Sequence, residues 1–110
     1  MKLVVAFLAL SLTPAFAHIA FQGATVADGA SVKDPGEVRL QFSENLEPGF
    51  SGAVLSDASG KPVATSRAIG GHAITLKSGG LKPGAYTVSW HGMGHNRHRI
   101  KGSLRFNVVP

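Results

Sequence analysis

Histidines are the residues of this chain whose type and spacing suggest chemistry. The chain contains five of them and no cysteine, which excludes thiolate metal sites and thiol catalysis. Three lie within residues 91–102, HGMGHNRHRIKG, as His91, His95 and His98. A neutral imidazole nitrogen binds copper, zinc or nickel. Because histidines in loops are also commonly solvated, this cluster alone predicts a metal site only weakly.

His18 is distinguished by the residues that precede it. Residues 1–17 read MKLVVAFLALSLTPAFA, a lysine and an apolar run that end in the small-x-small pattern after which signal peptidases cut. The apolar run is far shorter than the ~20 residues that span a bilayer. We therefore expect residues 1–17 to be a cleaved signal peptide and residues 18–110 to form one exported domain that is not inserted in the membrane.

A free N-terminal histidine offers a metal two donors, its α-amine and its ring nitrogen. An amine together with two or three imidazoles favours Cu(II), which has the highest affinity among the first-row divalent metals and accepts tetragonal nitrogen and oxygen sets. Soft Cu(I) prefers sulfur ligands, and Met93 is the only methionine outside residues 1–17. These residues predict a Cu(II) site.

The elements that position the histidines read as short strands. The run EVRLQFSE alternates strictly, with Val38, Leu40 and Phe42 on one face. Further β-type runs, separated by glycine- and proline-rich turns, cover residues 53–57, 63–69, 71–77, 85–93 and 102–109. No segment has an apolar stripe of helical period. The pattern is typical of an all-β fold, an antiparallel β-sandwich of about seven strands.

Two strand residues and one loop allow alternative interpretations. Tyr86 and Trp90 alternate along their strand, which favours the core over a carbohydrate-stacking surface. In FSENLEPGFSG, Glu44 and Glu47 resemble an acid/base pair. The proline and glycine of that loop instead favour a structural role, with Phe42, Leu46 and Phe50 packed beneath it.

The basic residues Arg97, Arg99 and Lys101 flank the loop histidines. They form either a solvated edge or a docking patch for an acidic partner or membrane headgroups. The cluster is too small to indicate nucleic-acid binding in an exported protein. The whole chain has a moderate net charge of +5, which falls by one if Lys2 is removed with the signal peptide.

Four segments together resemble the CopC family of periplasmic copper-binding proteins. They are HIAF followed by ADGASV, LQFSENLEPGFSG, LKPGAYTVSWH and HRIKGSLRFNV, and they cover the chain from His18 to its end. The resemblance implies a seven-stranded Greek-key sandwich of the immunoglobulin or cupredoxin type that binds Cu(II) at one end.

The resemblance also implies a ligand set. The family's ligands are the amine and ring of the first histidine, a histidine of the last loop, and an aspartate two residues before it. By position these fall on His18, on His98 and on Asn96, where a neutral amide replaces the carboxylate. We expect His95 to substitute as a ligand. His91 has the pattern of a structural or supporting residue, and His72 that of a surface residue.

The sequence thus predicts a periplasmic Cu(II) protein for copper storage, delivery or resistance that is not an enzyme. The resemblance suggests a copper-transporting inner-membrane protein as partner. Two alternatives stay open: a small oxidative copper enzyme with a histidine brace, and an interaction module that has lost tight copper binding because Asn96 replaces aspartate.

Overall fold

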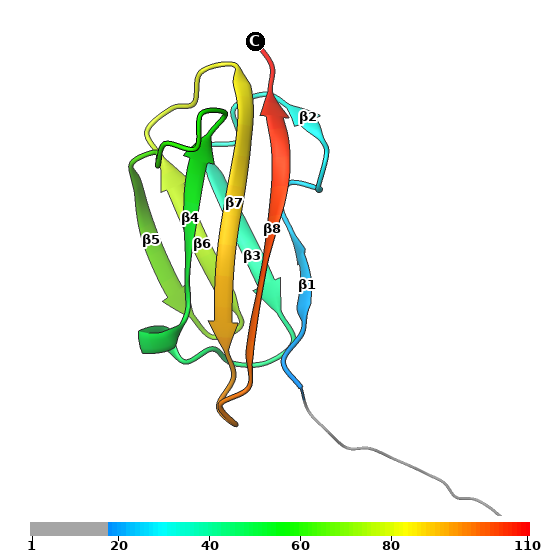
Figure 1. Ribbon diagram of the computed structural model, residues 1–110, viewed down its shortest axis with the longest axis vertical. Coiled ribbons are helices and arrows are strands. Elements are labelled where there is room, and N and C mark those ends of the chain that lie inside the picture. Colours follow the sequence, from blue (N-terminus) through cyan, green and yellow to red (C-terminus); the bar gives the residue numbers. More distant parts are fainter. Residues whose placement is uncertain (1–17) are drawn as a thin grey trace, which may run out of the picture.

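The computed structural model describes residues 18–110 as eight strands and one short 3-10 turn, η2 (Figure 1). The expected signal peptide, residues 1–17, lies outside the described residues. The elements are β1 (Phe21–Ala24), β2 (Ser31–Val32), β3 (Glu37–Phe42), η2 (Pro48–Phe50), β4 (Gly52–Asp57), β5 (Thr65–Gly70), β6 (Ala73–Ser78), β7 (Gly84–Met93) and β8 (Arg99–Val108). Within residues 18–110, no helix has the length and hydrophobicity needed to cross a bilayer.

The strands form two four-stranded sheets that pack face to face, as Figure 1 shows. One sheet has the order β1-β3-β6-β5 and the other β2-β8-β7-β4. All pairs are antiparallel except β2 with β8. The predicted all-β sandwich is confirmed, with eight strands instead of seven. Neither β1 nor β2 lies in a run that the sequence singled out, because both are short, and β2 is formed by its pairing with the end of β8.

The inner faces of the two sheets form one core, as the period-two patterns predict. Leu40 and Phe42 of β3 are fully buried, as is Val88 of β7. Trp90 is only 8% exposed and stacks on Phe21 of β1 at a centroid distance of 4.8 Å. The core interpretation of Trp90 is therefore confirmed.

Tyr86 is also a core residue, with a polar end that reaches a neighbouring turn. Its ring is buried and stacks on Phe106 at 5.8 Å. Its hydroxyl donates a hydrogen bond to the carbonyl of Lys82 at 2.7 Å. Neither aromatic ring is available as an exposed carbohydrate platform.

Three segments meet at the end of the sandwich where β7 stops and β8 starts. The segment before β1 is tied to the residues after β3, since the Ser43 N–H donates to the Ala20 carbonyl at 2.9 Å and the Ala20 N–H to the Ser43 hydroxyl at 2.8 Å. The residues after β3 are tied to the end of β7, since the Glu47 N–H donates to the Met93 carbonyl at 2.8 Å. This end therefore assembles the chain start, the loop after β3 and the β7–β8 loop.

The loop after β3 differs from its predicted packing in one residue. Phe42 and Leu46 are buried as expected. Phe50, however, is 58% exposed, because it lies on η2, which projects beyond the start of β4 instead of folding under the loop. The prediction that Phe50 packs beneath this loop is wrong.

Candidate metal centre

The structure brings His18 and His98 into direct contact. Their Nδ1 atoms lie 2.7 Å apart, and their rings stack at a centroid distance of 4.5 Å with 18° between the planes. His18 precedes β1 of one sheet, whereas His98 immediately precedes β8 of the other. Both residues are exposed, so their rings can turn. The pair thus joins the two sheets at one end of the sandwich and is open to an incoming ion.

His98 is held by a compact turn between β7 and β8. The Gly94 N–H donates to the His98 carbonyl at 3.1 Å, and the Arg97 N–H donates to the Gly94 carbonyl at 2.9 Å. Arg97 takes a left-handed backbone conformation with φ of 68°, which is uncommon for a residue with a side chain. The turn therefore fixes the backbone from which the His98 ring projects toward His18.

Asn96 stabilises this turn through its side chain. Its Oδ1 accepts a hydrogen bond from the His98 N–H at 3.2 Å. Such a two-residue reach is typical of Asn and Asp in turns. The amide oxygen is therefore already a partner of His98's own backbone, which gives Asn96 a positioning role beside the pair.

His95 takes a different direction from the one expected of a third imidazole ligand. Its Nδ1 lies 3.1 Å from Oε1 of Glu44, and its side chain is 70% exposed. Within residues 18–110, no three His, Asp or Glu side chains converge as a ligand set. The structure therefore brings His18 and His98 together and leaves His95 with Glu44.

Glu44, for whose loop the sequence favoured a structural role over an acid/base pair with Glu47, lies at this end beside His95. Its Oε1 is shielded from solvent and, although it lies within ion-pair distance of His95, accepts no hydrogen bond from the described residues. A Cβ built on Gly94 would collide with this carboxylate and would touch Ile19, the neighbour of His18. Glu44 is therefore the neighbour of His95, and among the described residues it does not join His18 and His98 in a cluster of three possible ligands.

The nearness of Glu44 to the histidine loop depends on two strand ends that are distant in the sequence. Glu44 follows Phe42 and Ser43, where β3 ends, and the histidine loop follows the end of β7. Sequence alone does not show that these two ends meet, because that depends on the bridge between Leu46 and Gly94.

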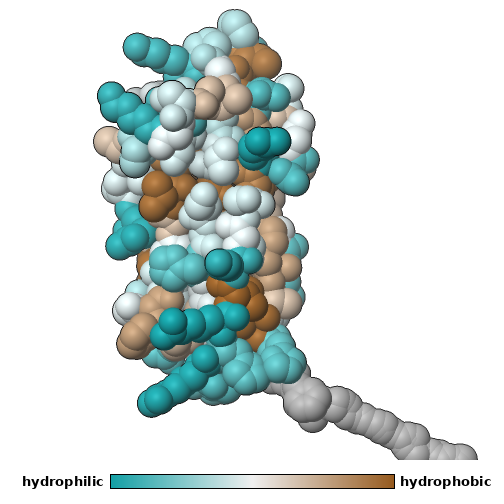
Figure 2. Space-filling view, viewed as in Figure 1, coloured by the Kyte–Doolittle hydropathy of each residue, from teal (hydrophilic) through white to brown (hydrophobic). Residues whose placement is uncertain are grey.

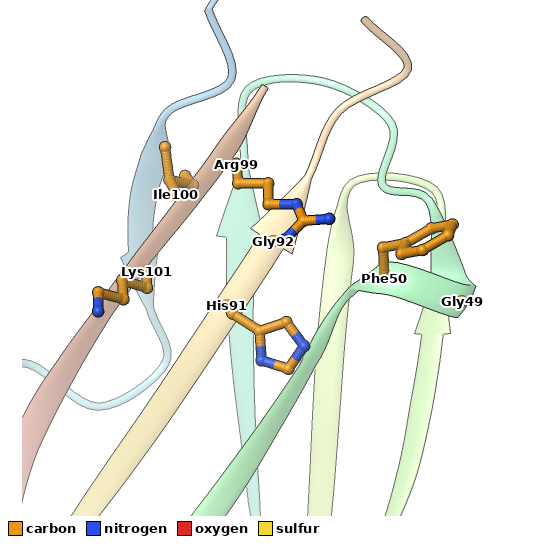
Figure 3. A pocket seen from close by; sticks show the side chains of 7 residues that line it. All are labelled: Gly49, Phe50, His91, Gly92, Arg99, Ile100 and Lys101. Atoms are coloured by element: carbon orange, nitrogen blue, oxygen red, sulfur yellow. The ribbon is translucent and has the colours of Figure 1, made fainter. Parts of the chain in front are cut away.

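The other two histidines lie away from the pair. The His72 carbonyl accepts a hydrogen bond from the Phe42 N–H at 2.8 Å, in the turn that connects β5 to β6. His91 is exposed on the outer face of β7 and lines a hollow there with Phe50 and Arg99 (Figure 3). Neither residue is part of the candidate metal centre formed by His18 and His98.

The sequence matches known proteins over most of its length. Residues 21–109 match the family model described as the CopC domain. The chain is 33% identical to Protein YobA of Escherichia coli K12, over 86% of this chain and 79% of YobA. It is 32% identical to Copper resistance protein C of Pseudomonas syringae pv. tomato, over 84% of this chain and 81% of that protein.

Solved structures have the same fold. PcoC, a methionine-rich copper resistance protein from Escherichia coli, superposes with a TM-score of 0.77 at 31% identity, over 84% of this chain and all of PcoC. CopC from Methylosinus trichosporium OB3b also gives a TM-score of 0.77, at 26% identity, over 84% of this chain and 95% of that one. With a family model that covers both sheets and relatives that match over most of their own length, this chain is a member of the CopC family.

Proposed function

We propose that this protein binds Cu(II) at the His18–His98 pair and serves copper storage, delivery or resistance. The observation that carries the proposal is the contact between these two rings, which are eighty positions apart in the chain. Two relatives named for copper resistance and the CopC domain match support copper as the cargo.

The two ring nitrogens are close enough to bind one ion together. The Nδ1 atoms lie 2.7 Å apart. Since the rings are nearly parallel, they must rotate until both lone pairs point at one ion. A set of imidazole and amine nitrogens favours Cu(II), which has the highest affinity among the first-row divalent metals.

The remaining donors come from the chain start and from His95. Removal of residues 1–17 would give His18 a free α-amine, which would make it a bidentate ligand. His95 would have to leave Glu44 and turn toward the pair to supply a third imidazole. Asn96 contributes by holding the turn.

The proposed mechanism is ligand exchange without a chemical reaction, so the protein is not an enzyme. Both imidazoles are exposed, so a competing partner can approach the ion and replace the ligands one at a time. The signal-peptide pattern and the copper resistance relatives support the periplasm as the proposed compartment of this exchange, and a copper-transporting protein of the inner membrane is the proposed recipient.

The test is a Cu(II) titration of residues 18–110 followed by electron paramagnetic resonance. It compares the chain that starts at His18 with the same chain carrying one extra N-terminal residue. We expect one nitrogen-rich site that weakens sharply when the extra residue blocks the α-amine. Equal binding by both chains, or binding by neither, would contradict the proposal.

A further inference from the structure

A trough runs along the outer face of the sandwich, beside the candidate metal centre. It consists of two adjoining hollows of about 540 and 460 Å³ that share Phe50 and Arg99 in their linings. Figure 3 shows the first hollow, where β7 forms the floor between η2 on one side and β8 on the other. The second hollow continues to His95 and Arg97. The trough therefore leads from His91, near the end of β7, to the histidine loop.

One wall of the trough is aromatic. Phe50, at the end of η2, is 58% exposed, and its ring is directed away from the core in Figure 3. Among the described residues, only two other large hydrophobic side chains, Val54 and Val109, are exposed. Phe50 is thus an isolated apolar contact surface.

The opposite wall is cationic. Arg99 and Lys101 alternate along β8 and are both exposed, while the inward-facing Ile100 lies between them. Figure 2 shows hydrophilic side chains gathered at the end of this face, beside a hydrophobic patch. Arg97 extends the cationic wall into the second hollow, where Glu47 is the one acidic lining residue.

Gly52 leaves space in which Arg67 lies close to His91, a residue that lines the first hollow. A Cβ at Gly52 would lie 3.1 Å from the Nη1 atom of Arg67 and 3.1 Å from Cε1 of His91. The absence of a side chain therefore lets a guanidinium from the other sheet approach the imidazole that lines the first hollow.

We propose that this trough is a docking site for an acidic, extended segment of a partner protein. Carboxylates of the segment pair with Arg99 and Lys101, and an apolar side chain between them packs on Phe50. Guanidinium groups match carboxylates in bidentate geometry, so Arg99 gives direction as well as charge. The proposal goes beyond copper binding, because docking needs no metal.

Two other occupants fit the trough less well. A second copy of this chain would bring its own cationic wall against this one, and like charges repel at close range. A membrane surface is flat, whereas the trough is concave and offers only the ring of Phe50 for insertion. A polypeptide segment fits both the concave shape and the mixture of aromatic and cationic walls.

The position of the trough gives docking a consequence for the proposed function. Because its second hollow ends at His95, a docked segment would lie beside the histidine loop. Docking would then raise the local concentration of a competing ligand beside the ion. That consequence rests on the proposed copper site, whereas the docking itself is tested without copper.

The probe is a short fluorescent peptide in which Glu and Phe alternate, titrated into metal-free residues 18–110 and followed by fluorescence anisotropy. Peptides with Gln in place of Glu, or Ala in place of Phe, test the two walls separately. We expect binding that weakens as salt rises, because exposed ion pairs are screened. Both altered peptides should bind more weakly than the original, and the peptide with Gln in place of Glu should lose more affinity than the one with Ala in place of Phe.

The protein variants are R99E/K101E and a charge-matched control, K33E/K77E, whose lysines are exposed and do not line the trough. We expect the first to lose about tenfold or more in affinity, as for charges that pair directly across an interface. The control should keep most of its affinity. F50A should weaken binding without changing its salt dependence.

Amide chemical shifts locate the bound peptide, with changes expected along residues 47–50, 91–93 and 97–101. The proposal is overturned if the two double variants weaken binding equally or if the shifts change elsewhere. It is also overturned if vesicles of anionic phosphatidylglycerol bind tightly while the peptide does not, or if the trough residues instead mediate self-association. A Cu(II) titration of F50A, which changes no charge beside His98, should match the unmodified protein and so separates failure of docking from failure of the copper site.

Discussion

His18 and His98, separated by eighty positions in the chain, place their ring nitrogens 2.7 Å apart. One ring precedes the first strand of one sheet, and the other precedes the last strand of the opposite sheet. An ion held between them would therefore link the two layers of the sandwich. Copper binding should consequently depend on the folded state, and copper should in turn stabilise that state.

Replacement of single histidines should rank their contributions to copper binding. We expect His98→Ala to weaken Cu(II) affinity by at least about a hundredfold, because it removes half of the observed pair. His95→Ala should have a smaller effect, since its ring contacts Glu44 and not His18. His72→Ala, in the β5–β6 turn, is the control. Competition titrations with a Cu(II) chelator measure all three, and equal losses would show that His98 has no special role.

Restoring a carboxylate in the turn should strengthen copper binding. Asn96→Asp keeps an oxygen that can accept the His98 N–H, so the turn should be preserved. It adds a negative charge beside the pair, which favours a divalent cation. We expect tighter Cu(II) binding in competition titrations, with an unchanged circular dichroism spectrum. Asn96→Ala, which loses the hydrogen bond without gaining charge, should instead weaken binding.

Gly94 leaves no room for a side chain above Glu44. Gly94→Ala would drive its Cβ into the Glu44 carboxylate, the far end of a flexible side chain that must move aside, so we expect a loss of at most about 1 kcal/mol in the free energy of unfolding. The His95–Glu44 contact should be disturbed as well. Gly79→Ala is the matched control, because a Cβ there meets nothing within 4 Å. Denaturant unfolding of the metal-free protein makes the comparison, and equal midpoints for the two variants would refute the predicted collision.

Asp34 should contribute to loss of stability in acid. Hydrogen bonds from the Leu81 and Gly36 N–H groups hold the pKa of the Asp34 carboxyl below its usual value of 3.8. A carboxyl whose pKa is lower in the folded state stabilises that state above its unfolded pKa. The contribution is lost as pH falls through the lower, folded value.

Asp34→Asn should therefore flatten the dependence of the unfolding midpoint on pH below about 4, the range in which a carboxyl of ordinary pKa becomes protonated. Thermal unfolding at a series of pH values measures this change. Glu37→Gln, an exposed carboxyl at the start of β3, is the control. If both variants keep the full acid dependence, Asp34 is not a source of it.

The fold could be predicted because its long strands alternate clearly. Leu40, Val88 and Phe106 are each buried where their patterns place them. The short strand β2 could not be predicted, because two residues show no period and depend on β8 for their partners. The position of Phe50 could not be predicted either, because the direction of η2 depends on where the chain enters β4 and not on the residues of η2 alone.

The sequence singled out His18 and His98 together, and the structure places their rings in contact. Their role as copper ligands stays a prediction. The preference of His95 for Glu44 depends on the meeting of two distant loops, which neither loop reveals in its own sequence. The trough beside Phe50 requires β4 to begin where β7 still continues, and only the register of the strands gives that.

The first strand gives the centre a further property. β1 has four residues, lies at a sheet edge and pairs with β3 through a register shift near Gly23. Such an edge opens more readily than the middle of a sheet. If His18 is tied to His98 through copper, fraying of β1 must begin by breaking a metal bond. Amide hydrogen exchange in β1 would then slow when the protein is loaded, and the rate of metal escape would include the rate at which this strand peels away from Trp90.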